Sequence, residues 1–341
     1  MRKQAAFGLL LGMLLSGVCL WYAFRGVSLN ALAHNVGRVG AGWVAASVAG
    51  CLFSLVLRAA RWRLLLHGGS GIGFWSLLSS TFIGMMANNV LPARLGEVVR
   101  AWVLARRERA PAVTVLASIA VERLFDIVAL VGILGLALVV SPPLAGGNTS
   151  AFHRAGVAGF LLSTVGAVAL LITVRYQSLI LRTTERWKEQ LRHAWALQGI
   201  NIFRRFLDGL WVLRGRMQTA VTVVLSFGIW AFGIVSLYVL AQGFGLALTL
   251  VQVTLVFVIV LFGIAIPSAP GFVGTFHGFC VAGLAMVAGT EPTLAAAYAT
   301  LLHGSQWLAI NVVGLACLLA DRSVSWASLI QVAGKAEKAG A

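Results

Sequence analysis

Three ionisable residues lie close together inside a long apolar stretch of this sequence. Glu122, Arg123 and Asp126 are one to four positions apart, and residues three or four apart share one face of a helix. A charge at the centre of a bilayer costs about 2.5 to 3.5 kcal/mol on insertion scales, so such residues usually pair or face a cavity. We therefore expect Arg123 to neutralise one of its two acidic neighbours or to reach Glu97.

A second charged group lies in an apolar region that is broken by Asn, Pro and Gly, and it contains Arg94, Glu97 and Arg100. Arginine suits phosphate because its planar guanidinium makes two parallel hydrogen bonds. One hypothesis is that Arg94 and Arg100, with Arg123, bind an anionic headgroup. Glu97 would then carry a coupling proton. The alternative is that these charges only fasten one membrane segment to another, a structural role that buried ion pairs often have.

The uncharged polar residues of the two breaks are candidates as well. Asn88 and Asn89 lie shortly before Pro92 and Gly96. The asparagines either satisfy backbone groups that the break frees or contact a substrate, because opened backbone inside a membrane must find partners. The second break offers bare backbone amides, which suit anions. Its candidate residues are Pro270, Gly271, Gly274 and Thr275.

Two histidines follow the second break. His277 comes directly after it, and His303 lies in the last apolar segment. A lone histidine in such a place is either a hydrogen-bonded structural residue or a proton relay. The sequence leaves both roles open.

The composition requires that membrane segments position these residues. Of the 341 residues, 60% are hydrophobic and 11% are charged, whereas a soluble domain is usually about 25% charged. A chain of this size has no water-soluble core that could hide so much apolar surface. The composition excludes a soluble enzyme, a secreted disulfide scaffold and a disordered protein. It predicts an all-α polytopic membrane protein.

The net charge of +16 does not indicate a nucleic-acid partner, because the basic residues lie between apolar runs, where the positive-inside rule places them. The sequence also lacks G-x-S-x-G, H-E-x-x-H and Walker-type motifs and any Cys/His cluster with metal-ligand spacing. We therefore predict that the protein is not an enzyme and that it holds no metal or cofactor.

Six apolar segments are long enough to be spans, which need about 20 residues each. The first follows Met1-Arg2-Lys3 as a signal peptide would, but it is too long for one and no cleavage site follows, so we expect a retained span. The segment 43–57 is short alone, and 58–66 can extend it. The predicted spans are 7–24, 43–57, 113–139, 155–174, 219–241 and 294–319.

Two further apolar regions, 74–105 and 250–289, are broken by Pro and Gly, which stop helices and permit tight turns. The limbs after the breaks, 95–105 and 276–289, are too short to cross a bilayer comfortably. The basic residues require that the first region begins and ends inside, so we predict two re-entrant hairpins that enter from opposite sides. With both termini cytoplasmic, this topology puts 22 basic residues inside and three outside.

The two halves of the chain share a pattern. Both breaks contain Pro-x-x-x-Gly, beginning at Pro92 and at Pro270, an offset of 178 residues that also relates predicted spans of the two halves. Interrupted segments at matching positions of two inverted repeats indicate the binding site of a transporter. The single membrane domain 1–341 is thus predicted to contain two inverted-topology repeats, 1–140 and 151–320.

Two basic regions are expected at the cytoplasmic surface. The segment 175–216, an insertion in the second repeat, mixes aromatic and basic residues, a composition that suits an amphipathic helix pair on the membrane. Arg58, Arg61 and Arg63, at the end of the second span, are expected to reach anionic lipid headgroups and to anchor the topology.

Three blocks of this sequence resemble the flippase-type transmembrane domain of lysylphosphatidylglycerol synthases. They are NNVLPARLGE at 88–97, ERLFD at 122–126 and PGFVGT at 270–275, and the resemblance covers essentially the whole chain. The family includes stand-alone members and relatives attached to polyprenyl-lipid glycosylation and hopanoid pathways. The resemblance implies movement of a lipid, often one with a charged headgroup, between leaflets.

The sequence departs from the family pattern at one position. Members usually place a glutamate three residues beyond the second glycine of the last block, where this chain has His277, so an acidic site is not carried over to the second hairpin. The aminoacyl-transfer domain is absent from this sequence, and synthase activity is therefore not implied.

The favoured hypothesis is a lipid flippase in a bacterial-type inner membrane. The headgroup of a phospholipid, polyprenyl-linked or hopanoid-type lipid would pass along a polar cavity between the hairpins. One alternative is an ion-coupled secondary transporter of a small solute. Another is a lipid-modifying enzyme or an accessory protein of a lipid-glycosylation pathway, although no nucleophile–base pair supports an enzyme. The expected partners are the substrate lipid and anionic lipids at the cytoplasmic face. The sequence does not decide whether the protein forms a homo-oligomer.

Overall fold

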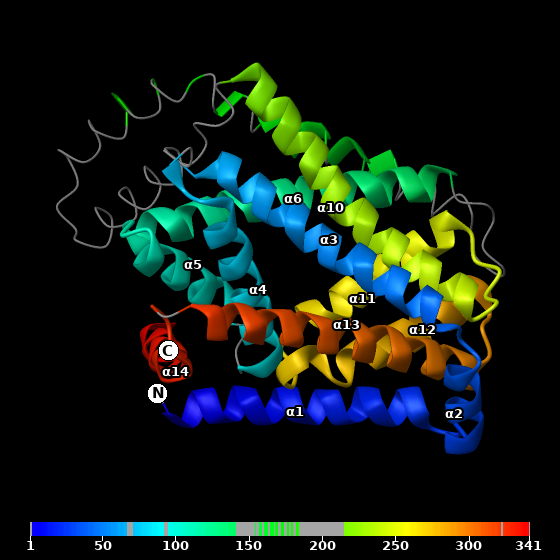
Figure 1. The fold of residues 1–341 in the computed structure, drawn as a ribbon. Helices are drawn as coiled ribbons and strands as arrows, with labels where there is room; N and C mark the ends of the chain where they lie inside the picture. The colour runs from blue at the N-terminus through cyan, green and yellow to red at the C-terminus, as the bar shows by residue number, and fades with distance from the viewer. Residues whose placement is uncertain are drawn as a thin grey trace.

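The structure is a computed structural model that describes residues 2–66, 71–91, 95–140, 215–321 and 323–340, with separate residues between 154 and 183. Every element in these ranges is a helix (Figure 1), which confirms the predicted all-α class. The helices are α1 (Arg2–Phe24), α2 (Leu29–Gly37), α3 (Ala41–Leu65), α4 (Phe74–Val90), α5 (Gly96–Arg107), α6 (Ala112–Val140), α10 (Arg216–Gly243), α11 (Leu250–Ala265), the 3-10 turn η4 (Pro270–Phe272), α12 (Thr275–Ala288), α13 (Pro292–Ala320) and α14 (Trp326–Gly340).

Five of the six predicted apolar segments form helices, namely α1, α3, α6, α10 and α13. Helix α3 continues through Leu65, as expected from the extension of 43–57. The sixth segment, 155–174, and the basic segment 175–216 fall mostly outside the described residues. Helices α2 and α14 were not predicted.

Several of these helices have the length and composition to cross a membrane. Among the described residues, four helical runs do so, at 41–65, 217–243, 270–288 and 292–320, and α1 with α2 does so as a pair bent by 80°. The third run counts η4 together with α12, which alone has 14 residues. A chain with this many apolar helices is a multi-pass membrane protein.

Two helix pairs are interrupted at the predicted breaks. In Figure 1, α4 and α5 lie toward the end of the bundle that holds both termini, whereas α11 and α12 lie toward the opposite end, where α2 is found. The members of each pair pack against each other, and η4 at the second break contacts α4. The two breaks therefore face each other within the bundle.

Helices α3 and α10 pack as an antiparallel pair along their lengths. Near one end, the Ser236 hydroxyl donates to the Ser47 carbonyl at 2.6 Å. Near the other, Arg61 donates to the Ser226 hydroxyl at 2.9 Å. Small residues allow two membrane helices to approach closely, and here they also leave room for polar contacts in the interface.

The second break is held by α1. Gly274 has φ 100° and ψ −67°, a conformation that glycine adopts at little cost, and a Cβ there would lie 2.2 Å from the Ser16 carbonyl oxygen. The Ser16 hydroxyl in turn accepts a hydrogen bond from the Ala269 amide at 2.8 Å. Helix α1 thus satisfies backbone that the break exposes.

Side-chain caps fix where two of the later helices begin. Helix α11 starts with a capping box, in which Thr249 and Gln252 satisfy each other's backbone amides. Helix α13 starts at Pro292, and the Glu291 carboxylate before it accepts from the amides of Thr293 and Leu294. These hydrogen bonds, that from Thr293 first, lower the pKa of Glu291.

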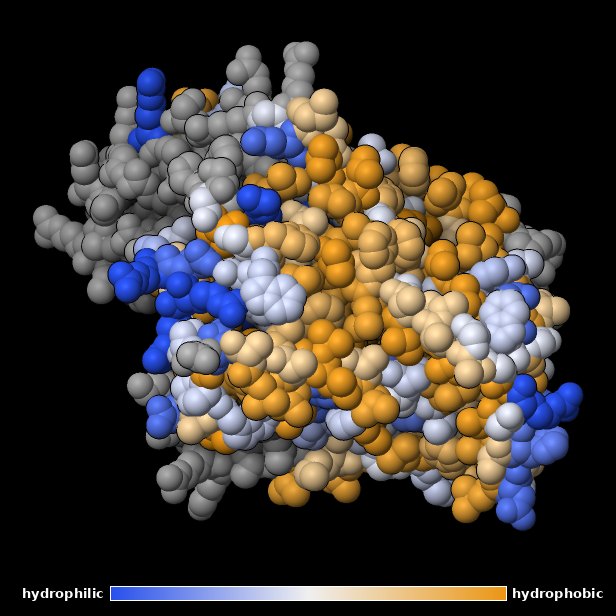
Figure 2. Space-filling view, in the orientation of Figure 1, coloured by the Kyte–Doolittle hydropathy of each residue, from blue (hydrophilic) through white to orange (hydrophobic). Residues whose placement is uncertain are grey.

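The surface agrees with a membrane location. Figure 2 shows apolar side chains covering the middle of the visible face, over α3, α10 and α13, while hydrophilic side chains gather at the end near α5 and at the end near α2. Val224, Leu308 and Val312 are each more than half exposed. Such a patch is far larger than soluble monomers usually expose, and lipid chains are the environment it suits.

The Gly274 contact predicts a strong effect of one added methyl group. We expect Gly274→Ala to lower the free energy of unfolding by about 2 kcal/mol or more, because it adds both backbone strain and a clash with Ser16. Thermal unfolding of the purified protein in detergent measures this. The control is Gly304→Ala in α13, where a Cβ meets nothing within 4 Å and should be neutral or slightly stabilising. Equal unfolding temperatures for the two variants would contradict the contact.

Candidate functional site

Glu122 is the centre of a set of buried charges. It projects from α6, is 0% exposed, and binds arginines from two other helices. The Arg58 Nη1 atom of α3 lies 2.8 Å from Oε1, and the Arg100 Nη2 atom of α5 lies 2.8 Å from Oε2. The Arg61 Nη2 atom is 3.3 Å from Oε1. One carboxylate thus joins α3, α5 and α6.

Asp126 lies one helical turn further along α6 and extends this network. Its Oδ1 atom is 2.8 Å from Arg61 Nη2, and its Oδ2 atom is 3.0 Å from Arg58 Nη1. We call this set the buried cluster, because each member is at most 6% exposed. Its members are Arg58, Arg61, Arg100, Glu122 and Asp126.

One ion pair lies at the accessible edge of the buried cluster. Arg123 Nη2 is 3.0 Å from Glu97 Oε1, and the two side chains are 41% and 30% exposed. Arg123 also lies 3.2 Å from Glu122 and 3.2 Å from Asp126. We expected Arg123 to pair with Glu122 or Asp126 or to reach Glu97, and in the structure it contacts all three. We call Arg123 and Glu97 the outer pair.

The buried arginines are also held by neutral groups. The Arg100 guanidinium lies 3.8 Å from the centre of the Trp62 ring, a distance that gives a favourable cation–π contact. The Trp62 indole donates to Ser118 at 2.9 Å, and Arg61 donates to Ser226 at 2.9 Å. The positions of the guanidinium groups are therefore fixed from several helices.

The expectation that Arg58 and Arg61 reach lipid headgroups is wrong. They are 6% and 0% exposed, because they fall on the same face of α3 as the buried Trp62 and Leu65. There they pair with the carboxylates of α6. Arg63, on the other face, is exposed. Arg58 and Arg61 were therefore not predicted as site residues.

At the first break, Asn88 takes the structural role. Its Oδ1 atom accepts a hydrogen bond from the Gly96 amide at 2.7 Å and so satisfies a free donor at the start of α5. A Cβ on Gly96 would lie 2.2 Å from the Gly84 carbonyl oxygen, so glycine is required for α4 and α5 to approach this closely. Pro92 and Arg94 lie outside the described residues.

At the second break, η4 lies against the end of α4. A Cβ on Gly271, which has φ +69°, would be 3.0 Å from the Asn89 carbonyl oxygen and 2.8 Å from Trp307 Nε1. The His303 Nε2 atom donates to the Gly271 carbonyl at 2.9 Å. The structure therefore places Gly271, a candidate residue of the second break, next to Asn89, a candidate residue of the first.

His277 lies apart from the charged residues. It is 7% exposed, and its ring contacts those of His303, Phe276 and Phe24 at centroid distances of 5.0, 6.0 and 5.9 Å. Thr275 is buried and donates to the Phe272 carbonyl at 3.3 Å. The residues that follow the second break thus form an aromatic and polar group of their own, next to α1.

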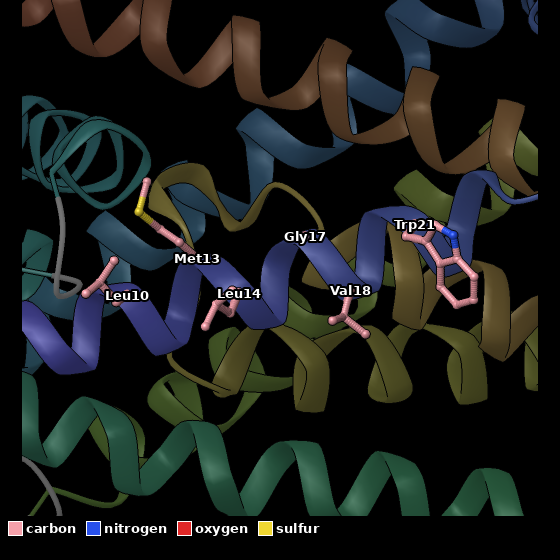
Figure 3. A pocket seen from close by; sticks show the side chains of 6 residues that line it. All are labelled: Leu10, Met13, Leu14, Gly17, Val18 and Trp21. Atoms are coloured by element: carbon pink, nitrogen blue, oxygen red, sulfur yellow. The ribbon is translucent and has the colours of Figure 1, made fainter.

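The cavities differ in character. An apolar groove of about 460 Å³ follows the outer face of α1, where Leu14, Val18 and Trp21 stand along one side (Figure 3). A smaller cavity of about 130 Å³, lined by apolar residues and by Ser54, Arg58, Ser236 and Gln306, lies beside α3. The cavity predicted between the hairpins stays a prediction. Within the described ranges, no group of three or more His, Cys, Asp or Glu side chains is placed to hold a metal ion.

Comparison with known proteins gives the family. The sequence model of the lysylphosphatidylglycerol synthase TM region matches residues 9–314. The chain belongs to this family. The resemblance found in the three sequence blocks is confirmed, and the buried cluster and both breaks lie inside the matched range. No solved structure matches the chain.

The similar curated proteins are membrane proteins and a glycosyltransferase. A UPF0104 membrane protein of Methanothermobacter thermautotrophicus is 26% identical over 275 residues, which are 76% of this chain and 78% of the relative. Another from the same organism is 22% identical over 289 residues, 77% of this chain and 81% of the relative. Glycosyltransferase AglD of Haloferax volcanii is 25% identical over 334 residues, 89% of this chain but 52% of the relative. The chain thus spans about half the length of AglD, and family and relative together indicate a lipid-related membrane protein.

The buried cluster predicts that Glu122 is essential for stability. We expect Glu122→Gln to lower the free energy of unfolding by about 3 to 5 kcal/mol, because it leaves buried arginines without their shared counter-charge. Thermal unfolding in detergent measures this. The matched control is Glu108→Gln, a partly exposed residue at the end of α5, for which we expect little change. A Glu122→Gln protein as stable as the control would show that the cluster does not hold the three helices together.

Proposed function

We propose that this protein moves a lipid with a polar headgroup between the two leaflets of its membrane without changing the lipid chemically. In this proposal the pairs α4–α5 and α11–α12 are re-entrant hairpins of two inverted repeats in a bacterial-type inner membrane. The headgroup passes where their breaks meet, while the acyl chains stay in the surrounding lipid. Family membership supports a lipid as the substrate. The arrangement of the two breaks supports movement of that lipid from one leaflet to the other.

The observation that carries this proposal is the position of the outer pair. Arg123 and Glu97 are the partly exposed end of a set of charges that is otherwise buried. Arg123 is fixed by carboxylates on both sides, so its guanidinium is preorganised to bind a phosphate oxygen with little loss of freedom. Glu97, which belongs to the first interrupted pair, can release Arg123 to the headgroup or bind a cationic one.

The interrupted helices support passage at this place. The first break begins at Leu91, one residue after α4 ends, and η4 of the second break contacts α4. In transporters with inverted repeats, discontinuous helices form the substrate site near the bilayer midplane. The N-terminus and the C-terminus lie at the same end of the bundle in Figure 1. This arrangement is required if both termini are cytoplasmic.

Lipid movement in proteoliposomes tests the proposal. We expect Arg123→Ala and Glu97→Gln each to slow the exchange of a fluorescent anionic phospholipid between leaflets by at least about tenfold, since each removes a charge that contacts the headgroup. The measurement is loss of fluorescence when a membrane-impermeant reductant is added outside. Arg63→Ala, which removes an exposed arginine of α3, should exchange lipid at the wild-type rate.

The same variants separate transport from a purely structural role. If the outer pair only fastens α5 to α6, the rate should fall together with the unfolding temperature in each variant. If it binds the headgroup, the rate falls while the unfolding temperature stays within a few degrees of wild type, because a partly exposed ion pair contributes little to stability. Wild-type exchange rates in both variants would reject the proposal.

The match to a glycosyltransferase favours one substrate class in particular. Because AglD is aligned over 89% of this chain, we propose lipid-linked sugars as substrates beside phospholipids. This also keeps open an accessory role in lipid glycosylation. A headgroup of that kind combines phosphate oxygens for Arg123 with hydroxyl groups for Glu97.

Mass spectrometry of lipid that copurifies with the protein distinguishes these substrates. We expect a sugar-bearing or phosphate-bearing lipid in the wild-type protein, and less than about a tenth as much in Arg123→Ala. Arg63→Ala again serves as the control. Equal amounts of the same bulk membrane lipids in all three preparations would contradict a specific headgroup site and favour transport of a small solute.

A further inference from the structure

A small, partly open cavity lies between four helices of the bundle. It is bounded by α3, α10, α11 and α13, most of its lining is apolar, and its volume is about 130 Å³. Liquid water takes about 30 Å³ per molecule, so this space holds a few waters or one small ion with water. It is far too small for a lipid. The lining residues are Cys51, Ser54, Arg58, Ile229, Trp230, Gly233, Ser236, Leu237, Phe257 and Gln306.

Two hydrogen-bond donors that line the cavity have no partner among the described residues. Arg58 is 6% exposed; its Nη1 atom binds carboxylates, but its Nε atom has no acceptor. The Trp230 Nε1 atom is buried and also has no acceptor. The Arg58 guanidinium lies 5.8 Å from the centre of the Trp230 ring, so both donors belong to one small region. Buried donors without an acceptor are rare in native proteins.

The uncharged residue Gln306 offers the cavity a further hydrogen-bond donor, and hydrogen bonds fix its position. Gln306 donates one amide hydrogen to Ser236 at 2.9 Å, and Ser236 donates to Ser47 at 2.6 Å. An amide has a second hydrogen. The Gln306 amide is thus held in place where α13 lines the cavity.

The charges beside the cavity do not balance. The buried cluster contains three guanidinium groups and two carboxylates, and the outer pair adds one charge of each sign. One positive charge is therefore in excess among the described residues of the site. The C-terminus of α3 offsets about half a charge at most. An uncompensated charge in a membrane interior is strongly unfavourable, and Arg58, the cluster member that lines the cavity, has an open Nε donor.

We propose that this cavity binds a small monovalent anion of the chloride class. The anion accepts from Arg58 Nε and Trp230 Nε1, and Gln306 closes the site from α13. Bound there, it neutralises the excess charge of the buried cluster and satisfies both open donors together. The site does not include the outer pair, although Arg58 and Arg123 share the Glu122 Oε1 and Asp126 Oδ2 atoms. The proposal does not require that the protein moves lipid.

Anion-dependent stability of the full chain tests this proposal. The purified protein in detergent is unfolded by heat in sodium chloride and in sodium gluconate at equal ionic strength. We expect the unfolding temperature to rise with chloride and to saturate, because chloride binds the folded state. Trp230→Phe keeps the ring and removes one donor, so it should need at least about tenfold more chloride for the same effect.

The control is Trp307→Phe, which also removes an indole donor that has no partner in the described part of the chain, but beside Gly271 instead of the cavity. It should respond to chloride as the wild type does. A wild-type protein that unfolds at the same temperature in both salts holds only water in the cavity, and the proposal is then rejected. An equal chloride response in Trp230→Phe and wild type would place the anion elsewhere. Crystals grown in bromide give a second test, since an anomalous scattering peak is expected beside Arg58 and its absence would reject the site.

Discussion

The burial of Glu122 among guanidinium groups from neighbouring helices is the interaction on which this arrangement depends. Neither sign of charge is tolerated alone in an apolar interior, so α3, α5 and α6 must come together for any of them to lose contact with water. Because α5 is the second half of an interrupted pair, this requirement also holds the first break in place. The ion pairs therefore require α3, α5 and α6 to be neighbours, while α10, α11, α12 and α13 pack around an apolar core.

Much of this could be read from the sequence, since both breaks and the charged stretch at 122–126 were found from residue types alone. The local reasoning for Arg123 held because Glu122 and Asp126 lie within one turn of it, and i, i+3 and i+4 spacing fixes proximity. The role of Asn88 could be narrowed to two alternatives, but only coordinates could show that its side chain caps α5. The lengths and compositions of the apolar segments also predicted the positions of most of the helices.

Arg58 and Arg61 show where sequence reasoning failed. Arginines at the end of a short apolar segment are usually placed at the lipid interface, and their carboxylate partners are more than 60 residues away in the chain. A signal was nevertheless present: Ser47, Cys51, Ser54, Arg58 and Arg61 repeat every three or four positions and mark one polar face of α3. A polar face on a membrane helix must be covered by protein, which the hydropathy average does not reveal.

The contact between α1 and the second break has a consequence for biosynthesis. Ser16 meets Ala269, a partner 253 positions later in the chain. The ribosome therefore delivers the first helix to the bilayer long before the backbone that it binds exists. Until then its small residues face lipid, where helices are individually stable and associate later. This contact therefore forms only after most of the chain has been made, and a nascent chain that stops before residue 269 lacks the backbone amide that Ser16 binds.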